Sequence, residues 1–216
     1  MSTLDLFRQA QPNQRVAIGA QAFILPGFAE PWLDQLLPAL DGIQQQAPFR
    51  QMSTKGGRRM SVHTTACGDL GWVSNEHGYR YSPIDPESDH PWPAMPDCLL
   101  ELAQRAAEAS GFTEFHPDSC LINRYLPGAR MGLHQDKDEK DFTAPIVSVS
   151  LGMSASFLFG GFKRSDRPSR TQLNHADVVV WGGADRLRFH GVMPIGDLAH
   201  PQLGRQRINL TLRKAG

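Results

Sequence analysis

The stretch RINLTLR, at residues 207–213, alternates polar and apolar side chains at every position. Successive side chains of a strand point to opposite faces, so two arginines, Asn209 and Thr211 would share one face, opposite three aliphatic residues. An exposed edge strand could show this alternation, but a solvated edge more often carries Lys or Glu. The pattern therefore favours a strand inside a sheet, with its polar face available to a ligand.

The same period of two appears in stretches upstream. LINRY (121–125) places Asn123 and Tyr125 on one face, and IVSVSL (146–151) alternates two serines with valine and leucine. Three more short apolar runs follow, most of them bounded by Gly, Pro or Asp: SFLFGG (156–161), DVVVWGG (177–183) and RLRFHG (186–191). Many short strands separated by turn residues indicate a sandwich or barrel. We predict a small β-sandwich with helices covering one face.

Two helices are predicted before these strands. The first covers about 30–46, where Trp, Leu and Ile recur at helical spacing, and Pro38 should kink or divide it. The second runs from about Pro96 to Ser110, and Gly111 fits its C-terminal cap. Between them, 48–93 is rich in Gly, Pro, Ser, His and aromatic residues, which indicates short strands and loops. Such a long irregular stretch in a compact domain is usually functional or mobile.

Length and charge restrict the class of protein. A chain of 216 residues suits one domain, and its apolar content suits a folded core. The 22 basic residues balance the 22 acidic ones, so net charge gives no reason to expect nucleic acid or a membrane surface as partner. The first hundred residues hold 7 basic and 10 acidic residues, and the remainder hold 15 and 12. An anion-binding surface is therefore expected to lean on the second half.

Cysteine usage and the first residues indicate the compartment. Cys67, Cys98 and Cys120 are odd in number and include no CxxC pair, so we expect reduced, packed thiols. The opening MSTLDLFRQAQPNQR lacks the features of a secretory signal, and no apolar stretch approaches the roughly 20 residues that span a bilayer. We expect a cytoplasmic protein with no membrane partner.

A metal site is predicted at His134 and Asp136. These residues lie two positions apart, so in an extended segment both side chains can converge on one ion. His190 follows a strand-like run, and a neighbouring strand could bring it to the same place as a third ligand. Two histidines and one carboxylate leave three octahedral positions free, as in the non-heme Fe(II) oxygenases. The same ligands could hold zinc in a hydrolase, and an HxD pattern alone often arises by chance.

The arginines of 207–213 suggest what else the site binds. Arg207 and Arg213 are six positions apart, roughly 20 Å on a fully extended strand. Strand twist and inward-leaning side chains shorten that separation. A small dicarboxylate could span between them, because arginine pairs bidentately with carboxylates.

These motifs together resemble the AlkB family, the bacterial dioxygenases that repair alkylated DNA. The similarity extends from about residue 45 through nearly the whole chain. It rests on PFRQM (48–52), GGRRMSV (56–62), CGDLGW (67–72), GYRYSPIDP (78–86), INRYLPGARMGLHQDKDE (122–139), PIVSVSLG (145–152), FLFGG (157–161), DVVVWGG (177–183), RFHG (188–191) and RINLTLR (207–213).

The resemblance implies a mainly β fold with flanking helices. Its core would be a double-stranded β-helix, or jelly roll, that binds Fe(II), 2-oxoglutarate as cosubstrate and O2. Residues 1–47 would form an N-terminal extension and a helix packed on the core. A nucleotide-recognition lid would occupy 48–93, and a helix plus the jelly roll would occupy 94–216, all within one structural domain.

The resemblance also implies roles for individual residues. By their place in the motifs, His134, Asp136 and His190 would be the iron ligands and the catalytic centre. Five polar residues would surround 2-oxoglutarate: Asn123, Tyr125, Arg207, Asn209 and Arg213. Arg213 would be best placed for the distal carboxylate, and Arg207 and Asn209 would lie nearer the keto-acid end.

The implied reaction is oxidative demethylation of bases such as 1-methyladenine and 3-methylcytosine. Decarboxylation of 2-oxoglutarate to succinate and CO2 would drive hydroxylation of the alkyl carbon, which would leave as formaldehyde. The substrate would be alkylated single-stranded DNA, with RNA and double-stranded DNA as further candidates, because a paired base must first be extracted. A monomer is expected.

The lid would supply the contacts to the substrate. Trp72 would stack on the damaged base opposite His134, Asp138 or Glu139 would favour a cationic base, and Asp138 would face its exocyclic amino group. Contacts to the nucleotide or its phosphates would come from three residues: Thr54, Tyr79 and Arg164. The lid departs from the family's pattern at three cations, so phosphate contacts should be more ionic and salt-dependent here: Lys55, Arg58 and Arg59.

Two alternatives remain at this point. The same cofactors could serve a different substrate, such as modified tRNA, a protein or a small molecule, but Trp72, Tyr79 and Asp138 would then lose their purpose. A non-enzymatic nucleic-acid-binding module with a structural metal is the other alternative. Structural zinc normally takes four protein ligands, often including Cys, whereas three ligands are evident here.

Overall fold

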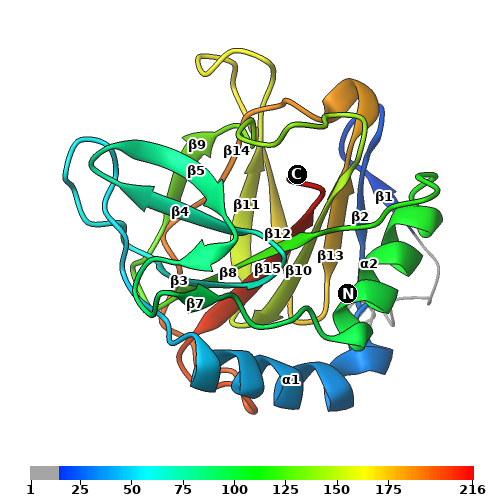
Figure 1. Cartoon of the computed structure of the whole chain (residues 1–216). Coiled ribbons are helices and arrows are strands. Elements are labelled where there is room, and N and C mark those ends of the chain that lie inside the picture. Colours follow the sequence, from blue (N-terminus) through cyan, green and yellow to red (C-terminus); the bar gives the residue numbers. More distant parts are fainter. Residues whose placement is uncertain (1–14) are drawn as a thin grey trace.

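The computed structural model describes residues 15–216, so the first 14 residues of the predicted N-terminal extension lie outside the described part. The described chain is mainly β, with two α-helices and two short 3-10 helices (Figure 1). Its elements in order are β1 (Val16–Ala17), β2 (Ala22–Leu25), η1 (Glu30–Trp32), α1 (Leu33–Gln46), β3 (His63–Gly68), β4 (Gly71–Asn75), β5 (Gly78–Ser82), β6 (Ile84–Asp85), β7 (His90–Pro91), α2 (Asp97–Ala109), β8 (Ser119–Tyr125), β9 (Met131–His134), β10 (Ile146–Gly152), β11 (Ala155–Phe159), β12 (Ser169–Leu173), β13 (Val178–Trp181), η2 (Gly183–Asp185), β14 (His190–Val192) and β15 (Arg207–Arg213).

Two sheets form the core of the molecule. The larger has the strand order β1-β2-β13-β10-β15-β8-β3, and the smaller has the order β12-β11-β14-β9. Apolar side chains from both sheets pack together between them, including Trp181 and Val179 of β13 with Phe157 and Phe159 of β11. The predicted β-sandwich is confirmed, and the arrangement matches the jelly roll that the resemblance implied.

β15 lies inside the larger sheet, with β10 on one side and β8 on the other. All seven of its residues are buried, so the edge-strand alternative is wrong. Ile208, Leu210 and Leu212 pack into the core beneath the helices. The opposite, polar face points between the two sheets and lines a cavity of about 540 Å³.

The two helices cover the outer face of the larger sheet. Their buried residues, among them Leu36 of α1 and Leu102 of α2, join one core with the aliphatic face of β15. α2 begins at Asp97, one residue after Pro96, and ends before Gly111, whose φ of 89° suits a glycine just past a helix end.

The sequence predicted that Pro38 would kink or divide the first helix, but the helix is not divided. α1 is continuous from Leu33 to Gln46, and the shorter η1 precedes it. Pro38 is exposed, and its missing N–H leaves the carbonyl of Asp34 without the usual helical donor. Burial of the apolar face holds the helix together across this gap.

The segment 48–93 forms short strands and loops, as predicted. β4 and β5 pair as a separate hairpin, and so do β6 and β7. β3, however, belongs to the larger sheet, where it pairs with β8. The hairpin of β4 and β5 projects beside the sandwich in Figure 1, and the boundaries of the lid stay a prediction.

The three cysteines are buried and free, as predicted, and Cys67 lies directly opposite Cys120 on paired strands. Within residues 15–216, no helix is long and apolar enough to cross a membrane.

Candidate active site

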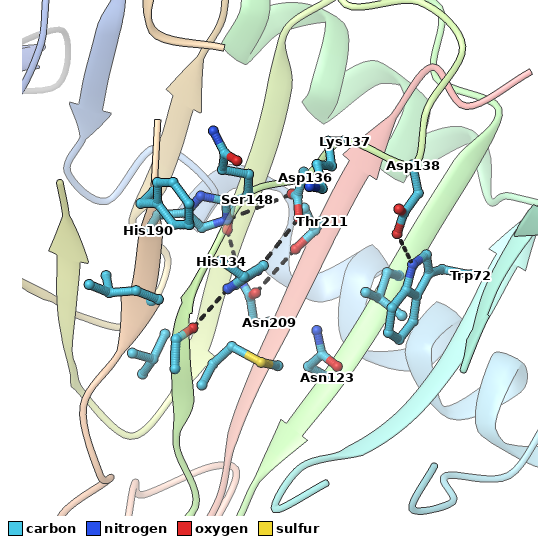
Figure 2. A pocket seen from close by; sticks show the side chains of 18 of the residues that line it. Trp72, Asn123, His134, Asp136, Lys137, Asp138, Ser148, His190, Asn209 and Thr211 are labelled. Carbon is cyan, nitrogen blue, oxygen red and sulfur yellow. Dashed lines mark hydrogen bonds and ion pairs between the residues drawn. The ribbon is translucent and has the colours of Figure 1, made fainter. Parts of the chain in front are cut away.

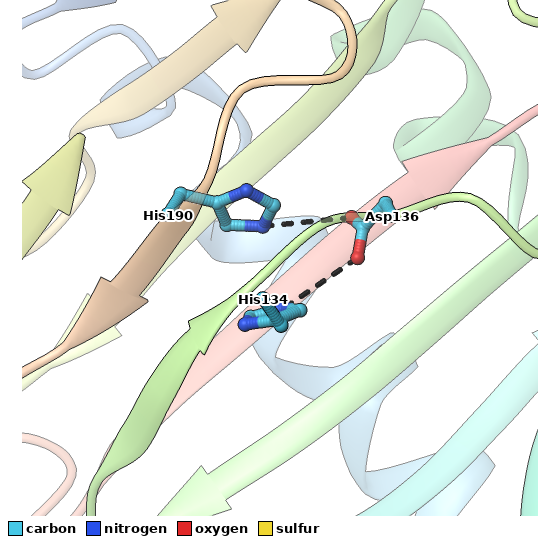
Figure 3. A group of neighbouring side chains, drawn as sticks. All are labelled: His134, Asp136 and His190. Carbon is cyan, nitrogen blue, oxygen red and sulfur yellow. Dashed lines mark ion pairs between the residues drawn. The ribbon is translucent and has the colours of Figure 1, made fainter. Parts of the chain in front are cut away.

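Two neighbouring strands of the smaller sheet bring two histidines together. His134 ends β9 and His190 begins β14, and these two residues are register partners. Gly191 permits this close pairing, because a Cβ there would lie 2.8 Å from the carbonyl oxygen of Met131. The ring centroids lie 4.3 Å apart, and Figure 3 shows both rings beside Asp136. The prediction that a neighbouring strand delivers His190 is confirmed.

The three side chains converge with the spacing of a metal site. Nε2 of His134 lies 3.5 Å from Oδ1 of Asp136, and Nε2 of His190 lies 3.7 Å from Oδ2. All three ligand atoms lie within 4.8 Å of one another. Atoms that bind one ion at about 2.1 Å and at right angles lie about 3 Å apart, so this spacing fits one transition-metal ion. Two histidines and a carboxylate leave positions free for a cosubstrate and O2.

Backbone carbonyl groups orient both imidazoles. Nδ1 of His134 lies 3.0 Å from the oxygen of Gly132, and Nδ1 of His190 lies 3.2 Å from the oxygen of Arg188. With Nδ1 donating in each case, the Nε2 lone pair faces Asp136 and is available to a metal. Gln135 lies between His134 and Asp136, and its side-chain amide donates to the backbone oxygen of Leu187. This hydrogen bond joins the segment that carries these two ligands to the residues just before His190.

An ion pair with Arg213 stabilises the buried carboxylate. Nη2 of Arg213 lies 2.7 Å and Nε 3.1 Å from Oδ2 of Asp136. Burial alone would raise the pKa of Asp136, but Arg213 and the two histidines hold it well below its usual range. Burial lowers the pKa of His190 to about 4, and His134 adds to the effect. Asp136 is therefore charged and His190 neutral at pH 7, which are the forms that bind a metal.

At the other end of β15, the Arg207 side chain is buried without a counter-ion. Its Nη2 donates to Oγ of Ser150 at 2.9 Å, and its guanidinium lies 5.1 Å from the ring centroid of Tyr125. No group in residues 15–216 accepts a hydrogen bond from its Nε or Nη1, and the side chain is 1% exposed. A buried cation with free donors is costly unless an anion joins it. This end of the cavity therefore fits a carboxylate.

The expected order of the two arginines is reversed. Arg213, expected at the distal carboxylate, contacts Asp136 and so lies at the metal end of the cavity. Arg207, expected nearer the keto-acid end, lies six residues away along the strand. Strand direction could not be read from the alternation of side chains, because both arginines share one face.

Amide groups line the wall between these ends. Asn209 donates through Nδ2 to Oγ of Ser148 and to the oxygen of Val149, and its Oδ1 accepts from Thr211. Asn123 lies opposite Asn209 on β8, and its buried Oδ1 has no partner among the described residues. Both side chains line the cavity with Tyr125, as the sequence predicted.

The hairpin of β4 and β5 forms one side of the cavity mouth. Trp72 stacks on Tyr79 with ring centroids 5.4 Å apart, and its Nε1 donates to Oδ2 of Asp138 at 2.9 Å. Figure 2 shows Trp72 across the cavity from His134. Thr54 and Arg164 also line the cavity, so all the predicted substrate contacts lie around one opening.

Sequence reasoning missed a buried network behind the metal ligands. Arg186, 3% exposed, donates to the backbone oxygen of Asp136 at 2.7 Å and to Glu139 at 3.2 Å. Tyr81 of β5 donates to Glu139 at 2.7 Å and accepts from Arg213 at 3.3 Å. Glu139 is therefore already paired with Arg186 and Tyr81, although it also lines the cavity, and its effect on a cationic base stays a prediction. The sequence signal was weak, because these residues lie in separate loops and strands without a shared period.

Comparison with known proteins identifies the family. The model of the 2OG-Fe(II) oxygenase superfamily matches residues 21–213. The "Alpha-ketoglutarate-dependent dioxygenase AlkB" of Escherichia coli (strain K12) is 54% identical over 99% of this chain and 98% of its own. The "Nucleic acid dioxygenase ALKBH1" of Mus musculus is 34% identical over 61% of this chain and 33% of its own. The solved structure of OsALKBH1 is 26% identical, with a TM-score of 0.81, over 93% of this chain and all of its own.

The chain therefore belongs to the AlkB family within the 2OG-Fe(II) oxygenase superfamily. It is a dioxygenase that depends on Fe(II), 2-oxoglutarate and O2. The requirements for Fe(II) and 2-oxoglutarate agree with the geometry: three convergent ligand side chains, and a buried arginine without a counter-ion in the same cavity.

The protonation states predict how metal affinity depends on pH. Burial would lower the pKa of His134, but its hydrogen bond and attraction to Asp136 outweigh this and raise it. Between about pH 5 and the pKa of His134, binding a metal should displace one proton, so affinity should rise about tenfold per pH unit and level off above that pKa. Anaerobic Mn(II) titration by calorimetry measures this dependence.

Replacing an exposed histidine outside the site, in His77→Gln, should leave the same curve. A rise of about a hundredfold per unit above pH 5 would mean that two groups release protons, and would contradict a neutral His190.

Proposed function

We propose that the chain demethylates alkylated bases in nucleic acids by oxidation. One observation carries the proposal: the buried Arg207, with two free donor groups, shares a cavity with the His-Asp-His group, and paired aromatic rings stand at the mouth. The cavity thus offers a metal site, a carboxylate site and a stacking surface. The mouse relative's name, a nucleic acid dioxygenase, supports the same substrate class.

We infer the orientation of 2-oxoglutarate from the two arginines. The keto-acid end would be held at the metal, so it would lie beside His134, Asp136, His190 and Arg213. The distal carboxylate would then pair bidentately with Arg207, close to Tyr125. Asn123 and Asn209 would line the chain between these ends. O2 would be the oxidant: bound Fe(II) would activate it, and 2-oxoglutarate would supply two electrons and leave as succinate and CO2.

The lid residues would position the alkylated base. Tyr79 covers one face of Trp72, and a 5.4 Å ring separation leaves no space for a base between them. The base would therefore stack on the other face of Trp72, toward His134. A base methylated at N1 of adenine or N3 of cytosine is cationic, which the indole face and the Asp138 carboxylate both favour. Hydroxylation of its methyl carbon would release formaldehyde and restore the base.

The proposal extends to the form of the nucleic acid, the cellular compartment and the oligomeric state. A single strand should be preferred over a duplex, since a base must leave its stack to enter the cavity. RNA carries the same adenine and cytosine bases and the same phosphates, and it would also be accepted. The buried, free cysteines suit a reducing cytoplasm. The expected monomer is checked by light scattering of the purified chain.

Replacing Arg207 should weaken binding of 2-oxoglutarate. Arg207→Gln removes a charged pair with the distal carboxylate, and a hydrogen bond to a charged group contributes about 1.5 to 3 kcal/mol, so the apparent KM should rise about 10- to 100-fold. Arg205→Gln, at an exposed arginine two residues earlier, is the control and should change nothing. Steady-state succinate formation measures both. An unchanged KM in Arg207→Gln would remove this residue from the cosubstrate site.

The proposed reaction is tested by mass spectrometry of a single-stranded oligonucleotide that carries one 1-methyladenine. We expect loss of the methyl group with Fe(II), ascorbate and 2-oxoglutarate under air, and no loss without 2-oxoglutarate. An intact oligonucleotide together with succinate formation would retain the dioxygenase and contradict this substrate.

A further inference from the structure

The metal ligand Asp136 lies in a loop without regular structure. Residues 135–145 connect β9 to β10 and contain no helix or strand. Strand pairing fixes both histidines, because His134 ends β9 and His190 begins β14. Asp136 has no such pairing, yet its Oδ2 lies 3.7 Å from Nε2 of His190. Side chains from elsewhere must therefore hold this loop in place.

Arg186 bonds this loop at three points. Its Nη1 donates to the backbone oxygen of Asp136 at 2.7 Å, its Nη2 to Glu139 at 3.2 Å, and its Nε to the backbone oxygen of Ala144 at 3.2 Å. Its guanidinium also lies 5.4 Å from the ring centroid of Phe142. One planar group thus joins both ends of the loop. Lysine could not replace it, because a single ammonium cannot reach acceptors placed around a guanidinium.

The segment that carries Arg186 is itself held in place. Arg186 follows η2, the turn at 183–185 that is drawn in orange in Figure 1. Gln21, just before β2, accepts from the backbone N–H of Ala184 at 2.7 Å through its side-chain oxygen. The backbone oxygen of Gln21 accepts from the N–H of Gly182 at 3.1 Å. Arg186 therefore reaches the loop from a turn that is bonded to the start of β2.

A second hydrogen bond joins the same two segments in the opposite direction. The side-chain amide of Gln135 donates to the backbone oxygen of Leu187, the residue after Arg186. Two adjacent residues on one side are thus bonded to two adjacent residues on the other. Leu187 lies three positions before His190. This pair of bonds therefore joins the segments that carry Asp136 and His190.

We propose that Arg186, together with Gln135, is a positioning residue of the metal site, which holds Asp136 at the place relative to His190 that one ion requires. Its charge does not explain this role, because a guanidinium repels a divalent cation and Glu139 compensates the charge. Groups that orient metal ligands typically change metal affinity about 10- to 100-fold when they are replaced. The inference concerns the metal site alone and does not depend on the nucleic-acid substrate.

Arg186→Lys tests the proposal, because it keeps the charge beside Glu139 and removes the contact at three points. Anaerobic calorimetric titration with Mn(II), without 2-oxoglutarate, should give a dissociation constant about 10- to 100-fold above that of the wild type. An effect of charge alone would leave the constant unchanged. An unchanged constant in the folded variant would overturn the proposal.

Arg50→Lys is the matched control. Arg50 also makes a bidentate, largely buried ion pair, with Asp85, but neither residue lines the cavity. Its replacement should lower the melting temperature of the metal-free protein and leave Mn(II) affinity unchanged. An equal loss of affinity in Arg50→Lys and Arg186→Lys would mean a general loosening of the fold and would overturn the proposal.

A second variant serves if thermal unfolding shows that Arg186→Lys does not fold. Gln135→Met removes one uncharged hydrogen bond at nearly constant size, and the Mn(II) dissociation constant should rise about 2- to 10-fold. Wild-type affinity in Gln135→Met would then contradict the positioning role.

Discussion

The ion pair between Arg213 and Asp136 is the interaction on which the rest of the site depends. A carboxylate removed from water is costly by several kcal/mol, and the Arg213 guanidinium at 2.7 Å offsets that cost. Asp136 follows the end of β9 in the smaller sheet, and Arg213 ends β15 in the larger one. The pair therefore fixes the two sheets relative to each other at the point where the metal ligands meet.

The two faces of β15 have different roles, one in stability and one in the active site. Its aliphatic face packs beneath α1 and α2 in the main core, and its polar face lines the cavity between the sheets. Tyr81 and Glu139 extend the polar network from Arg213 to the β4–β5 hairpin, which also carries Trp72. The hairpin that carries Trp72 is thus joined to the metal ligand Asp136 by hydrogen bonds through Tyr81 and Arg213.

Local pattern predicted much of this arrangement. The period of two in 207–213 identified the faces of β15, and the short spacing of His134 and Asp136 identified a metal site that His190 completes. The order of Arg207 and Arg213 was wrong, because alternation gives the face of a side chain but not which strand end meets the metal. Arg186 and Tyr81 were missed, since their partners come from distant segments that no local pattern joins. The prediction that Pro38 divides the first helix was wrong, because burial of Leu36 and Leu40 stabilises the helix around it.

The central claim is that the three ligands and the two arginines of β15 together bind Fe(II) and 2-oxoglutarate in one cavity. Anaerobic visible absorption tests it most directly, because a keto acid chelated to Fe(II) gives a charge-transfer band. We expect the band when 2-oxoglutarate is added to the Fe(II)-loaded wild-type protein, and its absence in Asp136→Ala. A wild-type protein that binds Fe(II) and 2-oxoglutarate without forming the band would contradict the account, since the cosubstrate would then lie away from the metal.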